Sequence, residues 1–510
     1  MMKKQLLTIA MGTMMAFTAS AQDATVSIRT DNATQKIHKE IYGQFAEHLG
    51  TCIYGGLWVG PESPIPNTQG YRNDVLQALR DLQVPVLRWP GGCFADEYHW
   101  RDGIGPQAQR KRMVNTNWGY VVEDNSFGTH EFLELCRQIG CEPYINANVG
   151  SGTVREMAEW VEYLNSEGDS SVVQERWANG RKEPFNVKYW GVGNESWGCG
   201  GNMEADFYAD VYRRFQTYCR DYGDNKLYRI ACGPNTDDWE WTETLMKKAA
   251  KYMDGLTLHY YDVPSGKWKD KGSATEFTEE RYYETLVKAA YMETLLRGHL
   301  AIMDRYDEDH RVKLLVDEWG CWHDVEPGTN PGFLYQQNTM RDAMVAAITL
   351  NIFNAHADRL GLCCIAQMVN VLQAMILTEG DQMVLTPTYH VFNMYKDHQD
   401  AELLESCVFS GTVTEDLKQI SASASIRDGS VTVTMANLHA TEKADVLVNV
   451  EGMEKAAVTG TVLAGAMDAL NTFQHPDTVK PVTLEGIVRT ERGLVVPMPA
   501  CSVVTLKFNA

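Results

Sequence analysis

Residues 187–195, with the sequence VKYWGVGNE, combine a short run of β-branched and aromatic residues with a polar ending. The apolar part has the length of a buried strand, and the glycines mark the point where the strand pattern stops. In a barrel of parallel strands the functional residues lie just after the strands, at their carboxyl ends. Asn194 and Glu195 are therefore the first candidates for a functional site.

Seven more runs of this kind occur between residues 41 and 370, separated by longer amphipathic stretches. This alternation is typical of βα units, and eight units predict a (β/α)₈ TIM barrel of the α/β class. The eight predicted strands are residues 41–45, 84–88, 143–147, 187–192, 228–231, 255–259, 314–316 and 362–366. Outer helices are predicted at residues 129–139, 203–222, 278–305 and 338–355.

From about residue 390 the pattern changes to strands in which apolar and polar residues alternate. This alternation predicts a C-terminal antiparallel β-sandwich resembling a jelly roll. We assign residues 41–388 to the catalytic barrel and 389–510 to the sandwich. The segment 22–40 contains an alternating run from Ala24 to Arg29, which is expected to add a strand to the sandwich.

The N-terminus has the composition of a signal peptide over residues 1–21. Lys3 and Lys4 precede an apolar run at 6–17, and the small residues Ala19-Ser20-Ala21 follow it. We therefore expect cleavage near Ala21 and export to the periplasm or the extracellular space. No later apolar stretch reaches the length of a membrane span, so no membrane anchor is predicted.

The formal charge of −21 disfavours nucleic acid and anionic membrane surfaces as partners and fits a neutral substrate. The 12 cysteines include no CxxC pair and no Cys/His cluster with zinc spacing, so most are expected to be buried thiols. His48, His259 and His323 also lack the spacing of a ligand set. We predict neither a metal nor a cofactor.

Polar and aromatic side chains follow almost every predicted strand, and two of them are glutamates. Glu195 follows the fourth strand and Glu318 the seventh, so both face the same mouth from opposite sides. A single glutamate at this position would be read as a rim charge or an ion-pair partner. The pair instead suits glycosidic bond cleavage, with Glu195 as general acid/base and Glu318 as nucleophile.

The motifs resemble those of glycoside hydrolase family 51, the α-L-arabinofuranosidases, over nearly the whole chain after residue 21. Five blocks carry the resemblance, at residues 43–50 (GQFAEHLG), 87–92 (LRWPGG), 190–195 (WGVGNE), 316–319 (VDEW) and 365–370 (IAQMVN). The resemblance implies retention of configuration and exo-cleavage of terminal arabinofuranosyl groups from plant arabinan, arabinoxylan or their oligosaccharides. It also implies oligomers, often hexamers.

The resemblance further implies which residues bind the sugar. Glu47 and Asn194 resemble ligands of the furanose hydroxyls, Arg88 a group that steadies the nucleophile, and Trp322 a wall beside the sugar. His259, Tyr261 and Gln367 would complete the pocket.

Cys93 departs from the family pattern, because many members have asparagine there and a thiol is a weaker hydrogen-bonding group. A disulfide between Cys52 and Cys93 is left open, with free thiols favoured. Two rival functions also stay open: an endo-glucanase or β-xylosidase on the same barrel, and a glycan-binding protein without catalysis.

Overall fold

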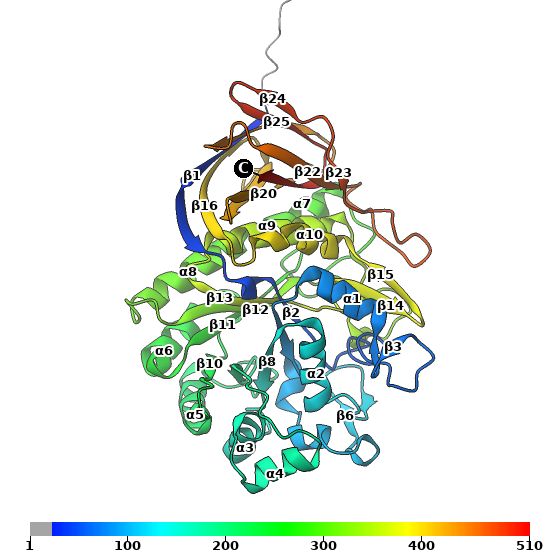
Figure 1. Ribbon diagram of the computed structural model, residues 1–510, viewed down its shortest axis with the longest axis vertical. Helices are drawn as coiled ribbons and strands as arrows, with labels where there is room; N and C mark the ends of the chain where they lie inside the picture. Colours follow the sequence, from blue (N-terminus) through cyan, green and yellow to red (C-terminus); the bar gives the residue numbers. More distant parts are fainter. Residues whose placement is uncertain (1–22, 510) are drawn as a thin grey trace, which may run out of the picture.

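Eight parallel strands close into a barrel in the computed structural model, which describes residues 23–509 (Figure 1). Each predicted strand is present, so the barrel prediction is confirmed. The strands, in chain order, are β2 (Gly43–Phe45), β5 (Val86–Trp89), β8 (Glu142–Ala147), β9 (Tyr189–Val192), β10 (Tyr228–Ala231), β11 (Gly255–Asp262), β12 (Lys313–Cys321) and β13 (Leu360–Ile365). Their apolar side chains form one continuous core with the surrounding helices.

The helices around the barrel follow the amphipathic segments of the sequence. They are α1 (Asn73–Leu82), α2 (Thr129–Ile139), α3 (Val154–Asn165), α4 (Ser171–Ala178), α5 (Ala205–Tyr218), α6 (Trp239–Ala249), α7 (Glu279–Ala290), α8 (Met292–Asp304), α9 (Met340–Ala355) and α10 (Pro387–Tyr395). The predicted helix at 278–305 is two helices that meet at Tyr291. No glycine or proline marks this break, so the hydrophobic pattern alone does not reveal it.

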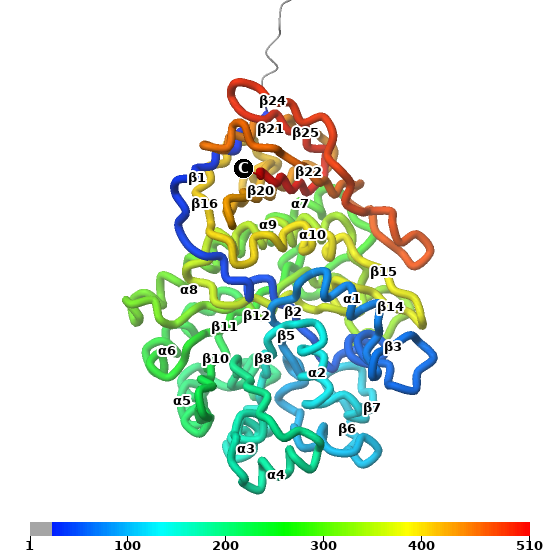
Figure 2. Tube along the Cα trace, in the orientation of Figure 1, coloured from blue at the N-terminus to red at the C-terminus, as the bar shows by residue number. Residues whose placement is uncertain are grey.

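The second domain is built on one large sheet of ten strands in the order β23-β22-β26-β20-β19-β16-β1-β21-β25-β24. Its strands are β1 (Ala24–Lys36), β16 (Glu402–Ser410), β19 (Ile420–Arg427), β20 (Ser430–Asn437), β21 (Ala444–Glu451), β22 (Ala457–Ala464), β23 (Val482–Thr483), β24 (Val488–Thr490), β25 (Gly493–Met498) and β26 (Ser502–Asn509). Figure 2 shows the N-terminal strand β1 beside β16. β1 runs antiparallel to β16 but parallel to β21, so the sheet is not wholly antiparallel.

Helix α9 lies between the barrel and the large sheet. The helix is buried on nearly all sides, and it packs against β12 on one side and against β19, β20 and β26 on the other. Thr339 and Asp342 cap its N-terminus reciprocally. The side chain of Gln373 links this end to the barrel, because it donates to the carbonyl of Asp342 and accepts from the amide of Cys321 in β12.

Four small hairpins complete the described structure: β3 (Asn67–Thr68) with β4 (Tyr71–Arg72), β6 (Met113–Asn115) with β7 (Val121–Glu123), β14 (Ile376–Glu379) with β15 (Gln382–Leu385), and β17 (Thr412–Thr414) with β18 (Leu417–Lys418). Among residues 23–509, no helix is both long and apolar enough to cross a membrane.

Candidate active site

Strands β11 and β12 bring four polar side chains to the mouth of the barrel. His259 and Tyr261 are two residues apart on β11 and so share a face, whereas Tyr260 between them bonds to the backbone of α7. Asp317 and Glu318 are consecutive on β12, where the register shifts against both neighbouring strands. The shift interrupts strict alternation, and both carboxylates reach the same arginine.

That arginine is Arg88, at the end of β5, and it is buried. Its Nη1 donates to Oε1 of Glu318 over 2.7 Å, its Nη2 to Oδ1 of Asn194 over 2.6 Å, and its Nε lies 3.2 Å from Oδ2 of Asp317. The guanidinium also lies over the ring of Phe45, 4.4 Å from its centroid. Arg88 thus fixes side chains from three strand ends at once.

Glu47, which follows β2, is buried and accepts three hydrogen bonds. Its Oε1 accepts from the amide of Gly92 at 2.9 Å and from Nε1 of Trp118 at 3.0 Å, and its Oε2 accepts from Nε2 of Gln367 at 2.5 Å. Burial raises the pKa of Glu47 to about 7, and the nearby charge of Glu318 adds to the effect. Glu47 is therefore held in place by protein groups before any ligand arrives.

Glu195 lies just after β9 with a positive φ of 39°, a conformation that non-glycine residues rarely adopt. Its Oε1 is 2.8 Å from Nδ1 of His259. Its Oε2 lies 3.4 Å from Sγ of Cys199 and 3.8 Å from Sγ of Cys93. Burial raises the pKa of Glu195.

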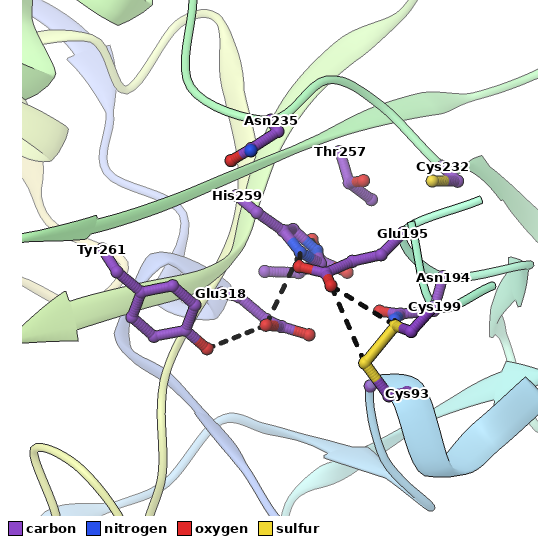
Figure 3. A network of polar contacts seen from close by, with 12 residues as sticks. Cys93, Asn194, Glu195, Cys199, Cys232, Asn235, Thr257, His259, Tyr261 and Glu318 are labelled. Carbon is purple, nitrogen blue, oxygen red and sulfur yellow. Dashed lines mark hydrogen bonds and ion pairs between the residues drawn. A yellow bond between two sulfur atoms is a disulfide. The ribbon is translucent and has the colours of Figure 1, made fainter. Parts of the chain in front are cut away.

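Cys93 and Cys199 form a disulfide against this carboxyl group (Figure 3). The expectation of free thiols at Cys93 is therefore wrong, and so is the alternative partner, because Cys52 is a buried free cysteine. A disulfide sulfur has no hydrogen to donate, so Cys93 cannot replace the asparagine of other family members as a donor. Most of the other cysteines are buried thiols, as predicted.

His259 lies between the two glutamates. Besides its contact with Glu195, its Nδ1 is 3.5 Å from Oε2 of Glu318, and its Nε2 is 3.1 Å from Oδ1 of Asp317. Burial opposes a charge on the ring, but the three carboxylates outweigh it and raise the pKa of His259 to about 10. The ring is therefore a cation at neutral pH and donates from both nitrogens. Asp317 also accepts from the hydroxyl of Tyr144 over 2.8 Å.

Four carboxyl groups thus meet two cations, Arg88 and His259, in one pocket. Burial raises the pKa of Glu47 and the pKa of Glu195, so both hold a proton to higher pH than an exposed glutamate does.

Aromatic groups form one side of the pocket. The hydroxyl of Tyr261 donates to Oε2 of Glu318 over 2.8 Å (Figure 3). The ring of Trp322 packs edge to face on Tyr261, with the ring centroids 5.0 Å apart. Contacts join eight of the ten predicted site residues, and Glu47 with Gln367 forms a second bonded pair that is linked to them through the charge of Glu318.

Sequence reasoning missed Trp118, Tyr144 and Cys199. Trp118 lies in the turn between β6 and β7, away from the ends of the barrel strands where functional residues are sought. Cys199 lies only four residues after Glu195, and this short spacing is a signal that the two side chains lie near each other.

Three groups of side chains have the composition of a metal site: Cys93 with Glu195 and Cys199, Glu195 with His259 and Glu318, and Cys321 with His323 and Asp342. The first has no thiolate because its cysteines are bonded to each other. In the second, both ring nitrogens of His259 face carboxylates. In the third, Nη2 of Arg341 lies 3.0 Å from Nε2 of His323, so a cation already occupies that side. These arrangements fit ion pairs better than metal ligation.

A (β/α)₈ barrel with two glutamates at the ends of its fourth and seventh strands, joined through one histidine, defines a glycoside hydrolase. The family models agree. Residues 78–282 match the α-L-arabinofuranosidase 1 domain and residues 317–502 match the α-L-arabinofuranosidase C-terminal domain.

Individual relatives match along the whole chain. A protein of Bacteroides ovatus named intracellular exo-α-L-arabinofuranosidase is 52% identical, with 96% of each chain covered. The crystal structure of the family 51 arabinofuranosidase from Xanthomonas axonopodis pv. citri is 49% identical, with a TM-score of 0.94, and covers 96% of this chain and 100% of its own. The arabinose complex of the Thermotoga maritima α-L-arabinofuranosidase is 30% identical, with a TM-score of 0.85, over 95% of this chain and 99% of its own. The chain belongs to glycoside hydrolase family 51, the α-L-arabinofuranosidases.

The comparison also corrects the prediction of export. The Bacteroides ovatus relative, which matches 96% of the chain, is named as an intracellular enzyme. The predicted signal peptide lies outside the described residues, and its prediction rested on composition alone: two lysines, a short apolar run and small residues. The assignment to the periplasm or the extracellular space is therefore wrong.

Proposed function

We propose that this enzyme is a retaining, exo-acting α-L-arabinofuranosidase that releases terminal arabinofuranosyl groups from arabinan, arabinoxylan or their oligosaccharides. One observation carries the mechanism: oxygen atoms of Glu195 and Glu318 and a ring nitrogen of His259 all lie within 4.8 Å of one another. A short separation between the two carboxyl groups leaves no room for a water molecule between the anomeric carbon and the carboxylate of Glu318. This arrangement favours double displacement over inversion.

In the first step the proton of Glu195 passes to the leaving oxygen while a carboxylate oxygen of Glu318 bonds to the anomeric carbon. Loss of the charge on Glu318 in the ester removes one cause of the raised pKa of Glu195. In the second step Glu195 takes a proton from water, whose oxygen attacks the anomeric carbon and releases Glu318. Each carboxyl group returns to its starting state.

The other residues hold these two groups and the sugar. Arg88 and Tyr261 bind opposite oxygens of Glu318 and aim it, while His259 positions Glu195. Glu47 and Asn194 are fixed by protein groups. Oε2 of Glu47 accepts only one hydrogen bond from the protein, so it can accept a second from a sugar hydroxyl, and the amide nitrogen of Asn194 can donate to another.

Three further groups complete the proposed pocket: Gln367 behind Glu47, Trp322 beside the sugar, and Cys93, which contributes a disulfide wall. Hexamer formation stays a prediction, which sedimentation velocity can measure.

Hydrolysis of 4-nitrophenyl α-L-arabinofuranoside, compared with the β-D-xylopyranoside and β-D-glucopyranoside, tests the sugar. We expect turnover of the arabinofuranoside alone; turnover of a pyranoside alone would favour the β-xylosidase or glucanase, and tight binding without turnover would favour the glycan-binding protein. Proton NMR of the first product tests the stereochemistry. An initial α-anomer supports retention, and an initial β-anomer rules it out.

A further inference from the structure

A series of aromatic rings leads from the proposed nucleophile to the surface of the protein. Tyr261 donates to Glu318, and its ring contacts Trp322 with centroids 5.0 Å apart and planes at 84°. Trp322 in turn contacts Trp268 with centroids 5.1 Å apart and planes at 87°. Glu318 is 5% exposed and Trp268 is 54% exposed, so the series runs outward from the bottom of the pocket.

Trp268 lies on the loop between β11 and α7, and several interactions hold this loop against the segment that follows β12. The amide of Trp322 donates to the carbonyl of Asp262 over 3.1 Å, and the amide of Asp324 donates to that of Gly272 over 2.9 Å. Nη2 of Arg281 on α7 lies 3.2 Å from both carboxylate oxygens of Asp270. The indole is therefore presented from a loop that is fixed on both sides.

An indole that is more than half exposed at the rim of a pocket leaves a large apolar surface in water. The rings before it in the series are more deeply placed and contact the nucleophile directly or through one neighbour. A furanose bound at Glu318 would lie beside Tyr261 and Trp322, because these rings contact Glu318 directly or through one neighbour. The next sugar of the substrate would then lie one ring further out, toward Trp268.

We propose that Trp268 is the platform for the sugar ring to which the reacting arabinofuranosyl group is attached. The C–H face of that sugar packs on the indole, while its hydroxyl groups stay in water. Trp268 would thus set the preference for glycosides whose leaving group is a sugar. This inference rests on the proposed function, because it assumes that the reacting arabinose lies at Glu318.

The test compares Trp268→Ala with the unmodified enzyme on two substrates, α-1,5-linked arabinotriose and methyl α-L-arabinofuranoside. Only the first has a sugar ring beyond the scissile bond. We expect kcat/KM for arabinotriose to fall about tenfold, mostly through KM, with less than about a twofold change for the methyl glycoside. Trp268→Phe keeps an aromatic face and should retain most of the activity on arabinotriose.

Trp177→Ala is the matched control, because this tryptophan is also exposed but lies on α4, which packs against α3, and its indole donates to the carbonyl of Lys182. This variant should leave kcat/KM unchanged for both substrates. An equal loss on both substrates in Trp268→Ala would mean that Trp268 only supports Trp322, and no loss on either would show that the indole binds no sugar; each result overturns the inference. If the unmodified enzyme cleaves neither substrate, the proposed function itself fails. A changed molecular mass of Trp268→Ala in sedimentation would assign the indole to a contact between copies and overturn the inference as well.

Discussion

Glu195 and Glu318 are the same residue type in one pocket, but their surroundings differ in kind. Glu318 accepts from a guanidinium and from a phenol, at 2.7 and 2.8 Å, and its side chain is 7% exposed. Glu195 faces one histidine on one oxygen and two disulfide sulfurs near the other, and its side chain is 18% exposed. Burial raises the pKa of Glu195 and the charge of Glu318 adds to the effect, while the hydrogen bond from His259 opposes it.

This difference shows how one fold can prepare the same type of side chain for the two proposed roles, general acid/base and nucleophile. The strand ends decide which groups surround each glutamate: a guanidinium and a phenol at Glu318, and a histidine and a disulfide at Glu195. His259 contacts both glutamates, so it couples them: loss of charge on one changes the pKa of the other.

The largest expected effect comes from removing each glutamate in turn. Glu318→Gln should lower kcat by at least about 10⁴-fold, because the neutral amide of glutamine cannot attack the anomeric carbon as the carboxylate does. Glu195→Ala should lower it by about 10²- to 10⁴-fold on arabinotriose, the range of a lost general acid. Added azide should then accelerate Glu195→Ala on 4-nitrophenyl α-L-arabinofuranoside and yield the α-azide, detected by NMR.

The configuration of the azide product decides the assignment. An α-azide from Glu318→Gln would exchange the two roles. Circular dichroism and thermal unfolding of both variants should match the unmodified enzyme, which excludes loss of fold as the cause.

The next effect concerns Arg88, which donates a hydrogen bond to Glu318, the proposed nucleophile. Arg88→Lys keeps a positive charge but cannot reach Glu318, Asn194 and Asp317 together, so kcat/KM should fall by about 10²- to 10³-fold. Arg72 provides a matched control: it is equally buried, but it bonds to Asp74 and to backbone carbonyls away from the pocket.

Urea unfolding separates activity from stability in this pair. Arg72→Lys should lose stability and keep kcat/KM per folded molecule. Equal activity losses in the two variants would show that Arg88 acts only through the fold.

A smaller effect follows from two glycines, one beside each glutamate. A Cβ on Gly92 would lie 2.7 Å from Oε1 of Glu318, so the carboxylate would have to move. A Cβ on Gly198 would lie 3.7 Å from the backbone oxygen of Glu195, an ordinary contact. Gly92→Ala should lower kcat/KM by about 10- to 100-fold, and Gly198→Ala by less than about twofold. Steady-state kinetics with the arabinofuranoside measures both, and the reverse order would contradict the packing described for Glu318.

Most of the barrel and the glutamate pair could be predicted from local sequence. Each barrel strand is a short apolar run, and the chemistry follows it at a fixed end, so Glu195 and Glu318 are found by position along the chain. The break at Tyr291 could not be found, because no residue there disfavours a helix. Trp118 reaches Glu47 from an excursion whose path depends on tertiary packing.

The disulfide shows where local reasoning ends. Cys93 follows the second barrel strand and Cys199 the fourth, and 106 residues separate them. Cys52 lies nearer in the sequence and after the adjacent strand, so it is the only partner considered for Cys93 from the sequence, with free thiols favoured. Only the path of both loops around Glu195 brings the two sulfurs together, and sequence does not encode that path in any short pattern.

The smallest expected effect comes from reducing this disulfide, which changes the surroundings of Glu195 but not those of Glu318. Reduction by dithiothreitol converts two sulfurs that cannot donate into two thiols beside Oε2 of Glu195. A donor to the carboxylate stabilises its charged form and lowers the pKa of Glu195, and the general acid must be protonated to act. The alkaline limb of the kcat/KM profile should therefore move to lower pH, by less than about one unit. The double variant Cys93→Ala with Cys199→Ala has no thiol to form, so dithiothreitol should leave its profile unchanged. A shift to higher pH on reduction, or an equal shift in the double variant, would show that the sulfurs do not help to keep the proton on Glu195.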